Sequence, residues 1–89
     1  MFSEALERGE FQKAFEHYQK ALEIFQRTSN PLGEADTLFN IGVAYLNLKR
    51  YEKAIEFFTK AKEKYSILGM EHAIQKVNNN IKIINNRQK

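Results

Sequence analysis

The amino-acid sequence repeats itself with a period of forty residues. When the sequence is aligned with itself at an offset of forty residues, many positions pair identical or chemically similar residues. The identical pairs include Leu6/Leu46, Lys13/Lys53, Ala14/Ala54, Glu16/Glu56, Lys20/Lys60, Ala21/Ala61, Glu23/Glu63, Asn40/Asn80 and Ile41/Ile81. Aromatic residues meet aromatic ones at Phe11/Tyr51, Tyr18/Phe58 and Phe25/Tyr65. A fixed period of this size indicates an array of helical repeats, because one helix pair cannot bury its apolar face alone and must stack on a neighbour.

Apolar residues recur every three or four positions along most of the chain, as in helices that bury one face. The positions are Phe11, Ala14, Phe15, Tyr18, Ala21, Leu22 and Phe25, then Ala35, Leu38, Ile41, Tyr45 and Leu48, then Tyr51, Ala54, Ile55, Phe58, Ala61 and Tyr65. No stretch alternates like a half-buried strand. The sequence therefore predicts an all-α chain, with Phe11, Tyr18, Phe25, Phe58 and Tyr65 in the core.

Few residues punctuate this pattern. Pro31 after Asn30 is typical of a helix start capped by asparagine, and Gly9 and Gly69 are placed like helix-ending glycines. We therefore expect a short helix from Phe2 to Arg8 and four longer ones in a single domain, 1–89. Its predicted parts are a partial first repeat at 1–29, a full repeat at 30–68, the first helix of a following repeat or a capping helix at 69–86, and a tail at 87–89.

Composition narrows the class of protein. Eighty-nine residues with 43% hydrophobic and 28% charged residues fit one small globular domain. The chain has no cysteine, no run of about 20 apolar residues that could span a membrane, and no signal-peptide pattern at its start. A cytoplasmic protein is expected.

Leu38, Ile41-Gly42 and Tyr45 fall on one predicted helix, and Ala54, Phe58 and Ala61 fall on the next. This pattern resembles the first and second helices of the tetratricopeptide repeat family. The resemblance covers nearly the whole chain, as one full repeat, the second helix of a preceding one and the first helix of a following one. The resemblance implies antiparallel helix–turn–helix repeats stacked as a short right-handed superhelical solenoid. Ser66 stands at the family's closing proline, and the period is forty residues in place of about thirty-four. This longer form resembles the arrays of bacterial peptide-sensing regulators and of cargo or polarity adaptors.

In this family the first helices line a concave groove that holds peptides, which implies a ligand-binding surface here. Its expected residues are Asp36, Phe39, Asn40, Val43 and Asn47 from one helix, and Lys76, Asn79, Asn80, Ile83 and Arg87 forty residues later. The predicted buried stripe of that later helix is Met70, Ala73, Ile74, Val77, Ile81 and Ile84. Side-chain amides both donate and accept, so Asn40 and Asn80 can bind a peptide backbone. The alternative is that the asparagines solvate a capping face.

No pattern in the sequence points to catalysis. It has no glycine-rich phosphate loop and no nucleophile with a base at helical spacing. His17 and His72 lack companions at metal-ligand spacing, so surface positions are expected, with no metal and no cofactor. Some family members clamp a terminal carboxylate with asparagine, lysine and arginine. Asn40 and Lys76 fit that clamp, but Asn80 stands where the arginine belongs, so no clamp is expected.

A non-catalytic scaffold that binds a peptide or protein segment is therefore the leading hypothesis. Nucleic-acid binding is an alternative, although Lys76, Lys82, Arg87 and Lys89 are few and widely spread. Self-assembly is another. A first helix as short as Phe2–Arg8 would leave the aromatic face near Phe11 under-covered, which favours a homo-oligomer through exposed end repeats.

Overall fold

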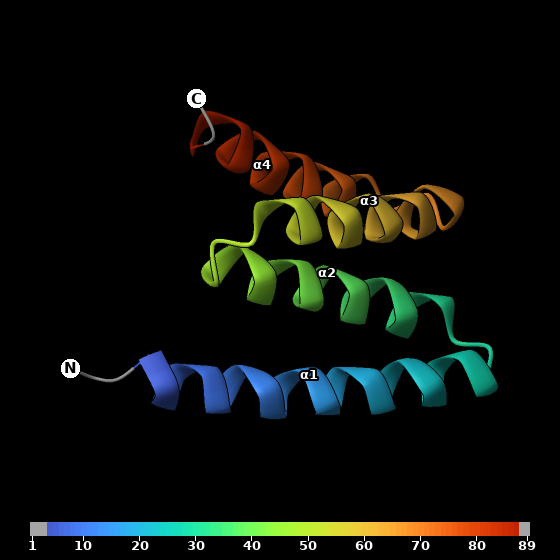
Figure 1. Ribbon diagram of the computed structural model, residues 1–89. Coiled ribbons are helices and arrows are strands. Elements are labelled where there is room, and N and C mark those ends of the chain that lie inside the picture. Colours follow the sequence, from blue (N-terminus) through green and yellow to red (C-terminus); the bar gives the residue numbers. More distant parts are fainter. Residues whose placement is uncertain (1–3, 88–89) are drawn as a thin grey trace.

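The protein forms four α-helices that lie side by side in chain order. The structure, a computed structural model, describes the backbone of residues 4–87 and the side chains of residues 10–87. The helices are α1 (Glu4–Arg27), α2 (Pro31–Asn47), α3 (Tyr51–Ile67) and α4 (Glu71–Arg87), and each runs antiparallel to the one before it (Figure 1). The predicted all-α class is confirmed. The right-handed superhelix stays a prediction.

Three turns of the same design set the helix spacing. Ser29, Lys49 and Gly69 lie twenty residues apart and have φ angles of 53°, 60° and 70°. After each of them an amide donates to the carbonyl five residues back: Asn30 to Phe25 at 2.8 Å, Arg50 to Tyr45 at 2.9 Å and Met70 to Tyr65 at 2.9 Å. In this type of helix ending, one residue adopts the left-handed conformation, and the following amide donates to a carbonyl that has no partner within the helix. Because the turns are evenly spaced, helices begin at residues 31, 51 and 71. Two such helices with their turns span forty residues, which is the period of the sequence.

The prediction that Gly9 ends a short helix is wrong. Helix α1 runs unbroken from Glu4 to Arg27 through Gly9, so the described residues hold four helices where five were expected. A glycine inside a helix costs only about 0.5–1 kcal/mol relative to alanine. Residues that favour helices follow Gly9 directly, with no turn sequence after it. The small cost of the glycine is therefore not enough to end the helix. At the other terminus, Arg87 belongs to α4 and not to the predicted tail.

The core lies where α2, α3 and α4 meet, and the α2–α3 interface is the most extensive of the three between neighbouring helices. Its buried members are Ala35, Leu38, Leu46, Ala54, Phe58, Ala61, Tyr65, Val77 and Ile84. Ala54 and Ala61 have no exposed surface, which shows that α3 approaches its neighbours closely at both positions. The predicted stripe of α4 is buried at Val77 and Ile84 and half-buried at Ile74 and Ile81.

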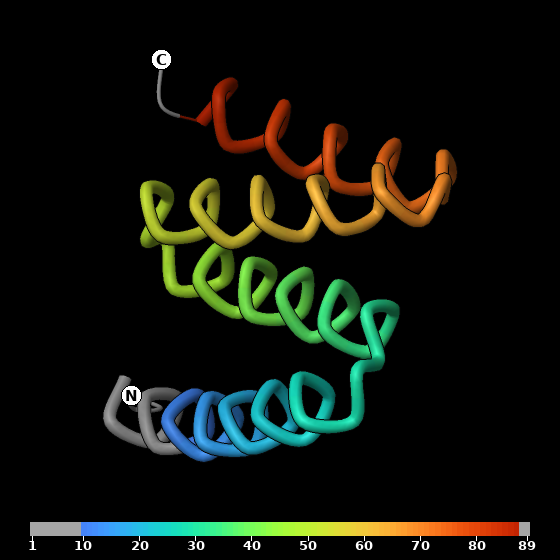
Figure 2. The backbone as a smooth tube through the Cα atoms, turned by 90° about the vertical axis from the view of Figure 1, so that its right-hand side faces the viewer, coloured from blue at the N-terminus to red at the C-terminus, as the bar shows by residue number. Residues whose placement is uncertain are grey.

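Glycines let aromatic rings reach the backbone of α2. A Cβ atom on Gly42 would lie 2.6 Å from the ring of Phe58 in α3, and one on Gly33 would lie 2.6 Å from the ring of Phe25 in α1. Phe58 is fully buried, so its ring cannot yield. The Cα atoms extend over 43 × 32 × 17 Å, so the helices form a thin layer. Figure 2 shows them one after another in chain order. A second row of rings joins Phe15, Tyr45 and Phe57, with centroid distances of 4.7 and 5.7 Å.

We expect Ala61→Leu to destabilise the domain by about 1–3 kcal/mol, because the added methylene groups overpack a site without free volume. Thermal unfolding followed by circular dichroism measures the change in Tm. Thr59→Leu is the control, since Thr59 is exposed on the same helix. Equal melting of wild type and Ala61→Leu would contradict the packing of α3 described above.

Substitutions at Lys49 and Gly69, which both have positive φ angles, test the account of the turns. Lys49→Gly should stabilise the domain by about 0.5–1 kcal/mol, because glycine adopts positive φ without the steric cost of a Cβ atom. Gly69→Ala should destabilise it by a similar amount, since a Cβ there meets no neighbour within 4 Å and only the backbone is strained. Chemical denaturation of the two variants should shift their midpoints in opposite directions. A shared direction would rule out this account.

Candidate ligand-binding groove

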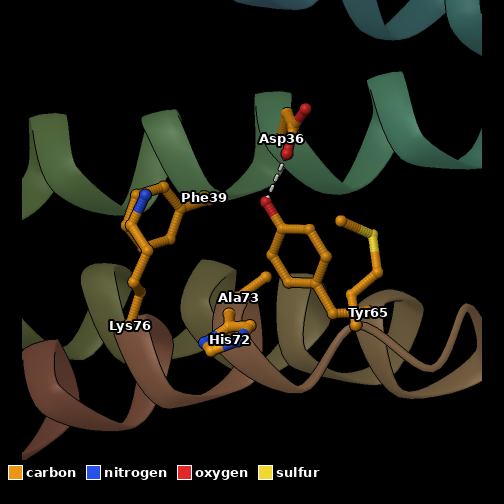
Figure 3. A pocket seen from close by; sticks show the side chains of 7 residues that line it. Asp36, Phe39, Tyr65, His72, Ala73 and Lys76 are labelled. Carbon is orange, nitrogen blue, oxygen red and sulfur yellow. Dashed lines mark hydrogen bonds between the residues drawn. The ribbon is translucent and has the colours of Figure 1, made fainter.

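A cavity of about 270 Å³ lies between α2 and α4. Asp36 and Phe39 line it from α2, and Tyr65 forms part of it from α3. Met70, which immediately precedes α4, and His72, Ala73 and Lys76 of the first turns of α4 complete it (Figure 3). Because α3 returns the chain between them, α2 and α4 run parallel and present equivalent positions to the same hollow. Asp36 and Lys76 are forty residues apart, so the repeat itself places these opposite charges at one cavity.

A hydrogen bond fixes the acidic wall. The Tyr65 hydroxyl donates to a carboxylate oxygen of Asp36 at 2.5 Å, while the tyrosine itself is only 4% exposed. Burial raises the pKa of Tyr65 far above its ordinary value, and the hydrogen bond to Asp36 and the charge of that carboxylate raise it further. The phenol therefore stays protonated and donates the hydrogen bond. This bond holds the Asp36 side chain in place although Asp36 is exposed to solvent.

The basic wall is arranged differently. The Lys76 ammonium lies over the Phe39 ring, 5.4 Å from its centroid, in the geometry of a cation–π interaction. Within the described part of the chain, no carboxylate forms an ion pair with Lys76, whereas Lys64 pairs with Glu34 at 3.3 Å between α3 and α2. Among the described residues, the direct partner of the Lys76 ammonium is therefore an aromatic ring and not a carboxylate.

The structure brings three of the ten predicted groove residues into the cavity: Asp36, Phe39 and Lys76. The others lie elsewhere along the two helices. Asn40, Asn47, Asn79 and Arg87 are exposed, Val43 and Asn80 are half-buried, and Ile83 is 43% exposed. The polar stripes thus extend beyond the cavity, which occupies the end of the groove near the start of α4.

The Asn80 side chain is bonded to its own helix. Its side-chain nitrogen donates to the main-chain carbonyl of Lys76 at 2.8 Å, four residues back on the same helix. Short amide side chains readily bond to nearby backbone in this way. One donor of Asn80 is therefore engaged before any ligand arrives. For Asn40 the structure gives no such bond.

Sequence reasoning missed four residues of the cavity, namely Tyr65, Met70, His72 and Ala73. Tyr65, Met70 and Ala73 had been assigned to the core or to a buried stripe. His72 is exposed, as predicted for a surface residue. It lies one helical turn before Lys76, so extending the groove stripe by one turn toward the start of the helix would have found it.

Metal-binding clusters and membrane-spanning helices are both absent from the part of the chain that the structure describes. The described side chains include no group of three histidine, aspartate or glutamate residues that could hold a metal ion. None of the helices between Glu4 and Arg87 combines the length and the apolarity that crossing a bilayer requires.

Comparison with known proteins now identifies the family. The sequence profile described as "Tetratricopeptide repeat" matches residues 4–66. The chain belongs to the tetratricopeptide repeat family. Proteins of this family are generally protein-interaction scaffolds without catalytic activity. The four antiparallel helices agree with the family's helix–turn–helix repeats.

A curated relative is RNA polymerase-associated protein CTR9 of Caenorhabditis elegans, which is 29% identical over 62 residues. The match covers 70% of this chain but only 5% of that protein. No solved structure is significantly similar to the chain. The match to the tetratricopeptide repeat profile leaves the assignment to a long-repeat type as a prediction.

The hydrogen bond between Tyr65 and Asp36 gives a pH-dependent prediction. Because the pKa of Tyr65 is raised on folding, its contribution is fully present below the ordinary value of 10.0 and is lost as the pH rises above it. Tyr65→Phe should cost about 0.5–1.5 kcal/mol at neutral pH and should lose less stability than wild type between neutral and strongly alkaline pH. Denaturant unfolding across that range measures both effects, with Tyr45→Phe as the matched control.

Proposed function

We propose that this domain binds a peptide or protein segment along the groove between α2 and α4. One observation carries the proposal: the cavity there is walled by equivalent positions of two parallel helices, with Asp36 on one side and Lys76 on the other. Ligand pockets are typically concave, mostly apolar and supplied with a few polar groups, which is how this cavity is built. The general role of tetratricopeptide repeats in protein interaction supports the same conclusion.

The charges of the two helices give the groove a polarity. Asp36 is the acidic residue that α2 contributes to the cavity. Lys76 is the basic residue that α4 contributes, and Arg87 follows it on the predicted groove stripe of the same helix. A bound segment therefore lies between an acidic and a basic wall, and complementary charges decide which segments fit and in which direction.

We also propose that α2 and α3 form one repeat of the long, forty-residue type and that α4 acts as a capping helix. Where α2 has Ala35, Leu38, Gly42 and Tyr45, α4 has Gln75, Asn78, Lys82 and Asn85 forty residues on. All four of the α4 residues are exposed. A lysine at the position of Gly42 would keep a ring such as that of Phe58 from approaching. The outer face of α4 therefore lacks a surface like the one that α2 offers to α3.

A protein ligand is favoured over a nucleic acid. The exposed basic residues of α4 are spaced along the helix and do not form the dense footprint that phosphate backbones require. The name of the relative CTR9 describes association with RNA polymerase, and we extend only the general class, a protein partner, to this chain. A steep salt dependence of binding to any nucleic acid would argue for the alternative.

Groove variants test the proposal. Asn40→Ala should weaken a peptide selected from a display library by roughly three- to tenfold, because it removes one or two hydrogen bonds of about 0.5–1.5 kcal/mol each. Asn80→Ala should weaken it less, since one donor is already engaged. Lys76→Glu should change which peptides are selected. Glu56 and Lys60 pair at 3.3 Å on α3 and serve as controls. If their substitution abolishes binding while the groove variants bind normally, the groove is not the site.

Self-association through α1 is a second proposal. Ala54, Phe58, Ala61 and Tyr65 of α3 are buried between α2 and α4, whereas their counterparts on α1 are only half-buried: Ala14, Tyr18, Ala21 and Phe25. Because the outer face of α4 is polar, stacking α4 of one copy on α1 of another is not favoured. We propose a symmetric contact between α1 helices.

Sedimentation equilibrium tests this contact. Wild type should dimerise reversibly below about millimolar concentration, and Tyr18→Ser should weaken the dimer, since it removes apolar surface from α1. Lys82→Glu on α4 should leave it unchanged. A strict monomer at about 1 mM would exclude the contact.

A further inference from the structure

We propose that the cavity between α2 and α4 is a side-chain pocket that selects ligand segments in which a large apolar side chain is accompanied by an acidic side chain. The inference rests on the proposed groove function and goes beyond it, because it assigns a specific ligand chemistry to the residues at one end of the groove.

The apolar requirement follows from the walls of the cavity. Phe39, Tyr65, Met70 and Ala73 supply most of the lining. The Tyr65 hydroxyl is bonded to Asp36 (Figure 3), so the tyrosine offers the cavity its ring and not a free donor. An unpaired polar group of a ligand would find few partners against these walls, which favours an apolar one.

The size of the cavity limits the occupant to one side chain. Its volume is about 270 Å³, while an enclosed apolar cavity of roughly 150 Å³ is enough to hold benzene. A leucine, methionine or phenylalanine side chain fits with room for its first backbone atoms. Met70 is unbranched and can adjust to the shape of whichever side chain enters.

The acidic requirement follows from the charges at the rim. The Asp36 carboxylate already accepts the Tyr65 hydroxyl. The Lys76 ammonium has the Phe39 ring as its neighbour and no carboxylate partner within the described residues, and His72 lies on the same wall. Asp36 thus already has a direct partner, whereas Lys76 is the charged group at this cavity that has no ion-pair partner among the described residues. An acidic group on the ligand would supply that partner.

The acidic group fits best as a side chain and not as the end of a peptide. Lys76 is exposed, so a flexible aspartate or glutamate can reach it while keeping one oxygen in water. A terminal carboxylate is attached directly to the backbone and needs donors for both oxygens inside the groove. The next residue of the stripe, Asn80, has turned a donor onto the Lys76 carbonyl at 2.8 Å.

Defined peptides test the pocket. Four probes share glycine–serine flanks: three blocked at both ends, with central Leu-Asp, Leu-Lys and Ala-Asp, and one with leucine next to a free C-terminus. Titrations followed by ¹⁵N-edited NMR measure their affinities and map their contacts. Leu-Asp should bind about three- to tenfold tighter than Leu-Lys and than Ala-Asp, with shifts at Met70, Ala73 and Lys76.

Two variants locate the effect. Ala73→Leu fills the pocket and should reduce the affinity of the Leu-Asp peptide to that of Ala-Asp. Lys76→Glu should reverse the order of Leu-Asp and Leu-Lys, whereas Lys82→Glu makes the same charge change at an exposed position outside the cavity and should keep the order. Should Ala73→Leu fail to fold, the two lysine variants still decide the charge requirement, and the leucine-to-alanine comparison on wild type decides the apolar one.

The outcomes separate this inference from the proposed function. Equal binding of the Leu-Asp and Ala-Asp peptides, with shifts along Asn40 and Asn47, would overturn the pocket and support the groove. Tighter binding of the free C-terminus than of Leu-Asp would overturn the side-chain assignment. No shift of groove residues by any probe would overturn the groove, and the pocket with it.

Discussion

The close approach of the Phe58 ring to Gly42 is the contact on which the rest of the structure depends. A Cβ atom at position 42 would lie 2.6 Å from that ring, so only glycine lets α3 come this near to α2. The ring is fully buried and is flanked by Phe39, whose centroid is 5.6 Å away. This packing sets how far apart α2 and α3 lie. Because α4 packs on α3, it also sets where α4 meets α2.

The candidate pocket is a consequence of that spacing. With α3 close to α2, Tyr65 reaches Asp36 and forms one wall, and α4 brings Lys76 over Phe39. Phe39 thus has two roles, since it contacts the core ring of Phe58 on one side and the Lys76 ammonium on the other. A change in the core is therefore expected to move the pocket walls, because packed interiors transmit small displacements.

The two ends of the helix stack differ in chemistry although they come from copies of one pattern. Helix α1 repeats the apolar positions of α3 but packs mainly against α2 among the described helices, and its aromatic residues are only half-buried. Helix α4 repeats the register of α2 with amides and a lysine at the outer positions. A stack with one apolar end and one polar end has a direction, and the proposed contact between copies uses only the apolar end.

The sequence by itself determined the helices, their order and most of the core. Helical spacing and the forty-residue period depend on residues a few positions apart, and the small residues Gly42, Ala54 and Ala61 mark the close crossings. The predicted helix end at Gly9 was wrong because a single glycine is compatible with both the interior and the end of a helix. The period also placed Asp36 and Lys76 at equivalent positions, which predicted part of the candidate site.

Only the tertiary structure decided what those residues do. Tyr65 meets Asp36 across two helices, Lys76 turns onto Phe39, and Asn80 bonds to its own helix. The contacts of Tyr65 and Lys76 depend on the distance between helices, which residues close together in the chain do not encode. The bond of Asn80 is local, but it depends on a side-chain rotamer that the sequence does not specify. Met70, His72 and Ala73 could not be assigned to the cavity from the sequence for the same reason, because they line it only once α4 has packed beside α2.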